Sequence, residues 1–164
     1  MLNPVIAEKL AKKYLLDKRT NDGEFFFAHT KGVVLSVQIL SEKFNLDKDK
    51  MISLAWIHDI GYFLNDTKNH AENSLRILDD EKIKLNEIDK DCILNHGTGK
   101  RPSFLEGKIM QIADKLSILN PDFLEVLLSK KKFKEDELDF VKMMCEKAIE
   151  MLKKLNVSNR FEDA

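Results

Sequence analysis

The stretch Ala55-Trp56-Ile57-His58-Asp59-Ile60-Gly61-Tyr62 places a histidine and an aspartate side by side in an otherwise apolar run. Burying polar or charged groups without a partner costs several kcal/mol, so this pair needs something to bind. A metal ion would satisfy both side chains at once. Residues of the same two types stand elsewhere in the chain and supply further candidate ligands: His29, His70, His96 and Asp114.

The setting of these residues favours a metal over a structural role. A lone histidine on an apolar face is most often a hydrogen-bonded core residue. Here all four histidines lie in or beside apolar helical patterns, and Asp59 and Asp114 interrupt two such patterns. Neither aspartate has an Arg or Lys one turn before it, so local ion pairing does not explain both. Imidazole nitrogen with carboxylate oxygen suits Mn, Fe, Co, Ni or Zn, and Mg less well.

The bulk composition describes one ordinary domain without an obvious large partner. The chain has 164 residues, of which 43% are hydrophobic and 34% charged, and its net charge of -1 does not single out a nucleic-acid duplex or a membrane. No long apolar window predicts a membrane span, and the start of the chain has no signal-peptide layout. Cys92 and Cys145 lack CxxC spacing and are expected to be reduced. We therefore predict a cytoplasmic protein and leave its oligomeric state open.

Apolar residues recur at helical spacing, and no alternating segment of useful length predicts a strand. Asn3-Pro4 is a good helix start, Gly61 is expected to break or cap the third helix, and Ser103 with Glu106 resembles a capping box. The sequence thus predicts a single all-α domain, 1–164, of six to eight helices, with a core over about 24–120, C-terminal helices over 121–155 and a frayed tail over 156–164. The predicted helices cover about 3–17, 24–44, 49–61, 70–80, 86–95, 103–119 and 135–155, and a Leu-rich segment covers 122–129.

The ordered series His29, His58-Asp59 and Asp114 resembles the signature of the HD superfamily of metal-dependent phosphohydrolases, an all-α family named for its His-Asp dyad. The segments Trp-Ile-His-Asp-Ile-Gly and Ile-Ala-Asp-Lys-Leu are similar to its best-kept stretches, and the resemblance covers about 24–120. It implies that His29, His58, Asp59 and Asp114 bind one divalent metal. His70 and His96 match the extra histidines of the two-metal branch, in which the dyad aspartate bridges both ions.

Three departures from known branches leave the substrate open. Tyr62 stands three residues after Asp59, where the deoxynucleoside-monophosphate enzymes carry Glu. Tyr62-Phe63 also replaces the Glu-Asp pair of the alarmone hydrolases. After His96 the chain reads Gly-Thr-Gly instead of the Gly-Tyr-Pro of the cyclic-di-GMP enzymes.

The resemblance implies hydrolysis of a phosphomonoester or phosphodiester, of a nucleotide, by water that one or two metal ions activate. Asp59 would orient this water while it holds the ion. The phosphate also needs cations, for which Lys115, Lys100 and Arg101 are the candidates, and Lys115 is favoured as a catalytic residue because the family has Lys or Arg there. The alternative for each is a solvated surface charge.

Three other interpretations of the chain stay open: a non-catalytic module that senses a metal or a nucleotide, a di-iron oxygenase on the same fold, and a metal-free helical bundle.

Overall fold

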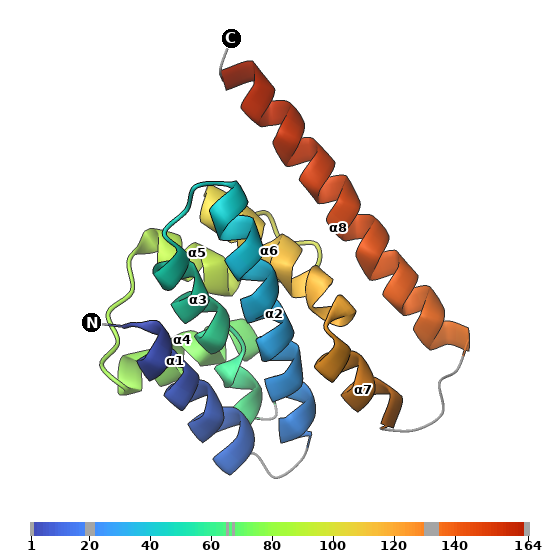
Figure 1. The fold of residues 1–164 in the computed structure, drawn as a ribbon. Helices are drawn as coiled ribbons and strands as arrows, with labels where there is room; N and C mark the ends of the chain where they lie inside the picture. Colours follow the sequence, from blue (N-terminus) through green and yellow to red (C-terminus); the bar gives the residue numbers. More distant parts are fainter. Residues whose placement is uncertain (1, 19–21, 65, 67, 130–134, 163–164) are drawn as a thin grey trace.

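The computed structural model describes residues 2–18, 22–64, 66, 68–129 and 135–162. Within these ranges the chain forms eight α-helices and contains no strand, which confirms the all-α prediction (Figure 1). None of these helices is both long and apolar enough to span a bilayer. The helices are α1 (Pro4–Ala11), α2 (Gly23–Lys43), α3 (Lys48–Ile57), α4 (His70–Asp80), α5 (Glu87–Leu94), α6 (Leu105–Leu116), α7 (Pro121–Ser129) and α8 (Glu135–Glu162), with a π-helical turn η1 (Lys12–Asp17) and 3-10 turns η2 (Ile60–Leu64) and η3 (Ser117–Leu119).

Helix α2 packs against α3, α6 and α7, and α1 packs against α3 (Figure 1). The core between these helices is apolar, and Val33, Ile57 and Ile112 within it are fully buried. Each such side chain contributes about 1.5–3 kcal/mol relative to an exposed one. The three helices α2, α3 and α6, which carry or adjoin four of the candidate ligands, are therefore fixed to one another by the best-packed part of the molecule.

The third helix ends earlier than predicted. α3 stops at Ile57, His58 caps it, and the chain turns at Asp59 into η2. Gly61 is not a left-handed cap. A Cβ at this position would lie 1.9 Å from the carbonyl oxygen of His70, so glycine is required for the close approach of α4. The end of this helix is set by packing against α4, which the periodicity of the helix itself does not encode.

The predicted capping box at Ser103 and Glu106 is wrong. α6 begins at Leu105, and the carboxylate of Asp91 on α5 accepts hydrogen bonds from the backbone N–H groups of Ser103 and Phe104 at 3.1 Å. A carboxylate twelve residues away in sequence thus satisfies N–H groups just before the helix.

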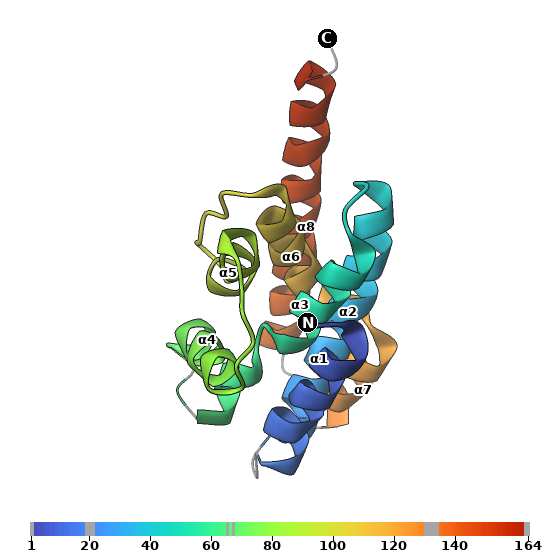
Figure 2. The same ribbon diagram turned by 90° about the vertical axis from the view of Figure 1, so that its left-hand side faces the viewer.

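The last helix is longer than predicted. α8 runs to Glu162 instead of ending near residue 155, and no Gly or Pro interrupts this stretch. It packs on α6 and extends well past the bundle (Figures 1 and 2). Ala148 and Leu155 are the buried residues of this contact.

Candidate metal centre

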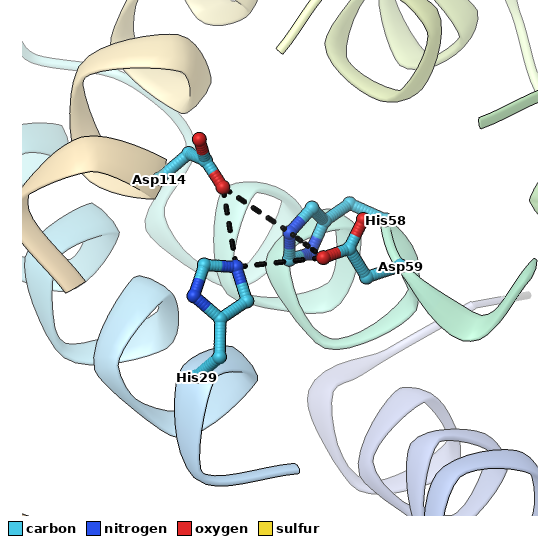
Figure 3. Close-up of side chains that lie close together, drawn as sticks. All are labelled: His29, His58, Asp59 and Asp114. Atoms are coloured by element: carbon cyan, nitrogen blue, oxygen red, sulfur yellow. Dashed lines mark ion pairs between the residues drawn. The ribbon is translucent and has the colours of Figure 1, made fainter. Parts of the chain in front are cut away.

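Four of the predicted ligands converge at the end of α3 (Figure 3). His29 comes from α2, His58 and Asp59 from the α3 terminus, and Asp114 from α6. His29 Nε2 lies 3.4 Å from Asp59 Oδ2 and 3.2 Å from Asp114 Oδ1. His58 Nε2 lies 3.2 Å from Asp59 Oδ2 and 3.9 Å from Asp114 Oδ1. We call these four residues the quartet.

A second group shares Asp59 with the quartet. Its other carboxylate oxygen, Oδ1, lies 3.3 Å from His96 Nε2 and 3.6 Å from His70 Nε2. The two imidazole Nε2 atoms are 3.2 Å apart. His70 is the first residue of α4, and His96 follows α5. We call Asp59, His70 and His96 the triad. Asp59 therefore presents one oxygen to each group, which is the arrangement of a bridging carboxylate.

In His58 and His96, a hydrogen bond at Nδ1 determines which ring nitrogen faces the centre. His58 Nδ1 lies 2.7 Å from the carbonyl oxygen of Ala55, and His96 Nδ1 lies 2.6 Å from that of Ile93. Because a carbonyl oxygen only accepts, each Nδ1 must carry the hydrogen. In the neutral ring the lone pair is then on Nε2, which points at Asp59. A metal ligand needs this tautomer.

The hydroxyl of Ser117 plays the corresponding role for the imidazole of His29. This hydroxyl lies 2.6 Å from the carbonyl oxygen of Asp114 and 3.0 Å from His29 Nδ1. The hydroxyl donates its single hydrogen to the carbonyl, so it accepts one from His29 Nδ1. Ser117 thereby ties the backbone at one quartet ligand to the ring of another.

The charges of the centre are strongly coupled. Burial opposes the imidazolium form of His29, but the Asp114 and Asp59 carboxylates outweigh burial and raise the pKa of His29 to about 10. Burial likewise opposes the Asp59 and Asp114 carboxylates, and neighbouring histidines nevertheless hold both pKa values below the usual range. Two buried carboxylates are thus kept charged, and they in turn raise the pKa values of His29 and His96.

The geometry fits a metal ion. His58 Nε2 and Asp59 Oδ1 are buried and have no hydrogen-bond partner among the described residues. Donor atoms bound to one ion at about 2.1 Å lie roughly 3 to 4 Å apart. The Nε2–oxygen distances within each group run from 3.2 to 3.9 Å. A cation would neutralise the carboxylates and occupy the lone pairs that the protein leaves unpaired.

The three basic residues predicted to bind phosphate differ in their distance from the centre and in their burial. Lys115 is buried beside the quartet, with Nζ 3.5 Å from Asp114 Oδ2, and it lines a cavity of about 300 Å³ that opens onto the ligands. Burial lowers the pKa of Lys115, against the opposing effect of Asp114. Lys100 and Arg101 are exposed and lie outside the lining of this cavity. Of the three, the structure brings only Lys115 to the centre.

Sequence reasoning missed two kinds of residue. Ser117 stands three residues after Asp114, a spacing that gives no signal on its own. Gln111 donates to the carbonyl oxygen of Gly97 at 2.8 Å and so fixes the loop that carries His96.

The second kind of residue lines the cavity. Phe123 and Phe140, from α7 and α8, lie in its wall beside the candidate ligands. No pattern in the sequence singled out either residue.

Comparisons with known proteins agree with this geometry. The sequence profile of the HD domain family matches residues 26–119. A deoxyguanosinetriphosphate triphosphohydrolase-like protein of Caldanaerobacter subterraneus subsp. tengcongensis is 31% identical over 112 residues, an alignment that covers 57% of this chain and 33% of that protein. This chain thus spans about a third of the length of the curated relative.

A crystal structure of a predicted HD superfamily hydrolase from an uncultured Thermotogales bacterium has a similar fold, with a TM-score of 0.62 at 18% identity, over 94% of this chain and 91% of that one. The profile match covers more than half of the chain and includes all six candidate ligands. The chain therefore belongs to the HD domain family.

Proposed function

We propose that this protein is a metal-dependent phosphohydrolase that holds two divalent ions and cleaves a phosphoester bond of a nucleotide. The observation that carries the proposal is the division of Asp59 between two groups of ligands, one oxygen toward the quartet and the other toward the triad. Metal pairs bridged in this way are typical of enzymes that transfer phosphoryl groups to water. The name of the curated relative supports a nucleotide as substrate.

Each side chain of the centre would have a distinct role in metal binding or catalysis. His29, His58 and Asp114 would hold one ion, His70 and His96 the other, and Asp59 both. Divalent ions in such a site lower the pKa of water and neutralise charge on phosphate oxygens. Asp59, fixed among four imidazoles, would orient the attacking water. Lys115 would offset the negative charge of Asp114 and of a phosphate bound in the cavity. Its ammonium group is buried, lies 3.5 Å from Asp114 Oδ2, and donates to the backbone carbonyl oxygens of His96 and Gln111.

The test joins metal analysis to a phosphatase screen. Purified protein is analysed for metals, stripped with a chelator, reloaded with Mn, Co, Ni, Fe, Zn or Mg, and assayed for phosphate release from nucleotides. We expect about two ions per chain and metal-dependent phosphate release that His58→Gln abolishes. Asp122→Asn is the control, since Asp122 is exposed and pairs with Lys31 on the surface.

Other outcomes would contradict the proposal in distinguishable ways. Bound iron with oxygen uptake and no phosphate release would indicate an oxygenase. Bound metal with nucleotide affinity but no turnover would indicate a sensing module. A protein that binds no metal under any loading condition would be a structural bundle.

A further inference from the structure

The cavity next to the metal centre has an aromatic wall that the ligands do not explain. Phe25 from α2, Phe123 from α7 and Phe140 from α8 line it. All three lie outside residues 26–119, the segment matched by the family profile. We call these three residues the aromatic wall. Because it lies outside the matched segment, the shared family profile does not account for it, and it is a candidate for substrate specificity.

The aromatic wall adjoins the quartet directly. The rings of Phe25 and Phe123 meet edge to face, with centroids 5.1 Å apart, and Phe123 meets the imidazole of His29 at 5.4 Å. Phe123 is buried together with Ala28 and Ile118 in a small second core. A group resting on Phe25 and Phe123 would therefore lie next to the proposed ions, on two rings that are held in place by packing.

Among the aromatic residues described along the cavity, Phe140 is the one with a largely exposed ring. Tyr62 lines the cavity too, but it stacks on Phe26 at 4.2 Å and on His70 at 4.4 Å, so its ring is already engaged by two neighbours. Phe140 is 48% exposed, and no ring contact to it is found among the described residues. The exposed part of the Phe140 ring is therefore available to a flat ligand in the cavity.

The charge of the cavity limits how much phosphate it can hold. Among its described lining residues Lys115 is the one Lys or Arg, against the carboxylates of Asp59 and Asp114. At about 300 Å³ the cavity lies at the lower end of the range for ligand pockets. Two ions and one lysine suit a single phosphate group, whereas the additional charges of a triphosphate would find no further cation among these residues.

We propose that the substrate is a phosphomonoester whose alcohol carries a flat aromatic group, such as a nucleoside monophosphate, and that Phe140, with Phe25 and Phe123, binds that group. Because Tyr62 stands where the known deoxynucleoside-monophosphate enzymes carry Glu, this recognition would differ from theirs. This inference rests on the proposed phosphohydrolase function. Water adds its oxygen to phosphorus, the ester P–O bond breaks, and the leaving-group oxygen takes up a proton. The products are inorganic phosphate and the free alcohol, here a nucleoside.

The experiment compares substrates that differ in one feature at a time. Deoxyguanosine monophosphate is set against the triphosphate, which adds charge, and against ribose 5-phosphate, which lacks the base. In wild type we expect the highest kcat/KM with the monophosphate. Phe140→Ala should lower the ratio of kcat/KM for deoxyguanosine monophosphate over ribose 5-phosphate by about tenfold, mainly through KM, as expected for loss of one stacking contact.

Two further variants of α8 separate stacking from damage to the helix. Phe140→Trp keeps a flat face and should keep most of the ratio, whereas Phe140→Leu, which is apolar but not flat, should behave like Phe140→Ala. Ile149→Ala is the control, because Ile149 is 50% exposed on the same helix and does not line the cavity. Circular dichroism of each variant checks that α8 remains helical.

The outcomes distinguish this inference from the proposed function. A ratio unchanged in Phe140→Ala, or a kcat/KM for the triphosphate above that for the monophosphate, would overturn the inference while the phosphohydrolase activity stands. NMR titration with deoxyguanosine measures nucleoside binding independently of turnover. Nucleoside binding that weakens in Phe140→Ala, in a protein without phosphatase activity, would support the wall and refute the proposed function. Absence of both binding and turnover would refute the two together.

Discussion

His29 and His58 on one side of Asp59, and His70 and His96 on the other, differ in the elements that position them, although His58 and His96 make the same Nδ1 hydrogen bond to a backbone carbonyl oxygen. The quartet comes from α2, α3 and α6, which pack against one another through the core. In the triad, His70 is the first residue of α4, and its ring stacks on Tyr62 with an angle of 4° between the planes. His96 stands in a loop that Gln111 fixes. We infer that the quartet binds its ion more tightly than the triad does.

Asp59→Asn should have the largest effect, because Asp59 is the residue that both groups share. The substitution keeps the size of the side chain and removes its charge. We expect loss of both ions and a fall in activity of at least about a thousandfold. Metal analysis and phosphate release measure these two results. Retention of one tightly bound ion would show that the groups do not depend on a common carboxylate.

His70→Ala and His29→Ala compare the two groups directly. If the quartet is the tighter site, His70→Ala should leave about one ion per chain, and His29→Ala should leave less than one, since the remaining triad site is weak. Metal titration followed by calorimetry gives the stoichiometry and the affinity of each variant. Equal losses in the two variants would contradict the ranking of the sites.

The fold was largely accessible from the sequence, because helical periodicity identifies elements and their apolar faces. His70–Asp80 was predicted at its observed bounds. Two of the three boundary errors fall where a distant residue sets the boundary: α4 approaches so closely that position 61 must be glycine, and Asp91 satisfies the N–H groups before α6. Such contacts join residues far apart in the chain, and the periodicity of a single helix does not predict them. The third error, the end of α8, is local, because no Gly or Pro interrupts that stretch.

The candidate site was accessible only in part. The six candidate ligands stand out because His and Asp are unusual in apolar helices, and in the structure they form two groups that share Asp59. The sequence does not indicate which carboxylate oxygen of Asp59 faces the quartet and which faces the triad, because this depends on how the helices pack. Ser117 and Phe140 were missed because serine and phenylalanine are ordinary residues in a helical protein, and their roles come from neighbours on other helices.

Metal affinity should rise with pH. Without metal, the carboxylates raise the pKa of His29 from 6.5 to about 10, so at pH 7 this ring is protonated and an ion must displace the proton. Affinity is expected to fall by about tenfold for each pH unit below that value and for each proton displaced. Calorimetry in buffers of different ionisation enthalpy counts the protons released. Binding without proton release at pH 7 would contradict this expectation.

The same shift affects the metal-free protein with the opposite sign. A histidine whose pKa is raised on folding stabilises the fold fully below its unfolded value of 6.5, and this contribution is lost as the pH rises through about 10. Thermal unfolding of chelator-treated protein between pH 6 and pH 10 measures this loss, and metal-loaded protein should not show it to the same extent.

Ser117→Ala should weaken the quartet alone. It removes the hydroxyl that accepts from His29 Nδ1, so the ring loses the contact that fixes its orientation. Loss of such a supporting contact typically costs roughly 10- to 100-fold in metal affinity. Ser53→Ala is the matched control, since both serines are 2% exposed and Ser53 only bonds within its own helix. An equal decrease at both ions would indicate general damage instead of a local effect.

Tyr62→Leu should have the smallest effect, and it should fall on the triad. Leucine keeps an apolar contact with Phe26 but cannot stack on His70, which is then free to rotate away from Asp59. Aromatic pairs contribute about 0.5–1.5 kcal/mol beyond their buried area, which corresponds to a two- to tenfold loss of affinity. Titration should show this loss at the weaker ion only. A larger loss at the tighter ion would mean that the ring stack supports the whole centre, and that Asp59 does not divide it into two separately supported sites.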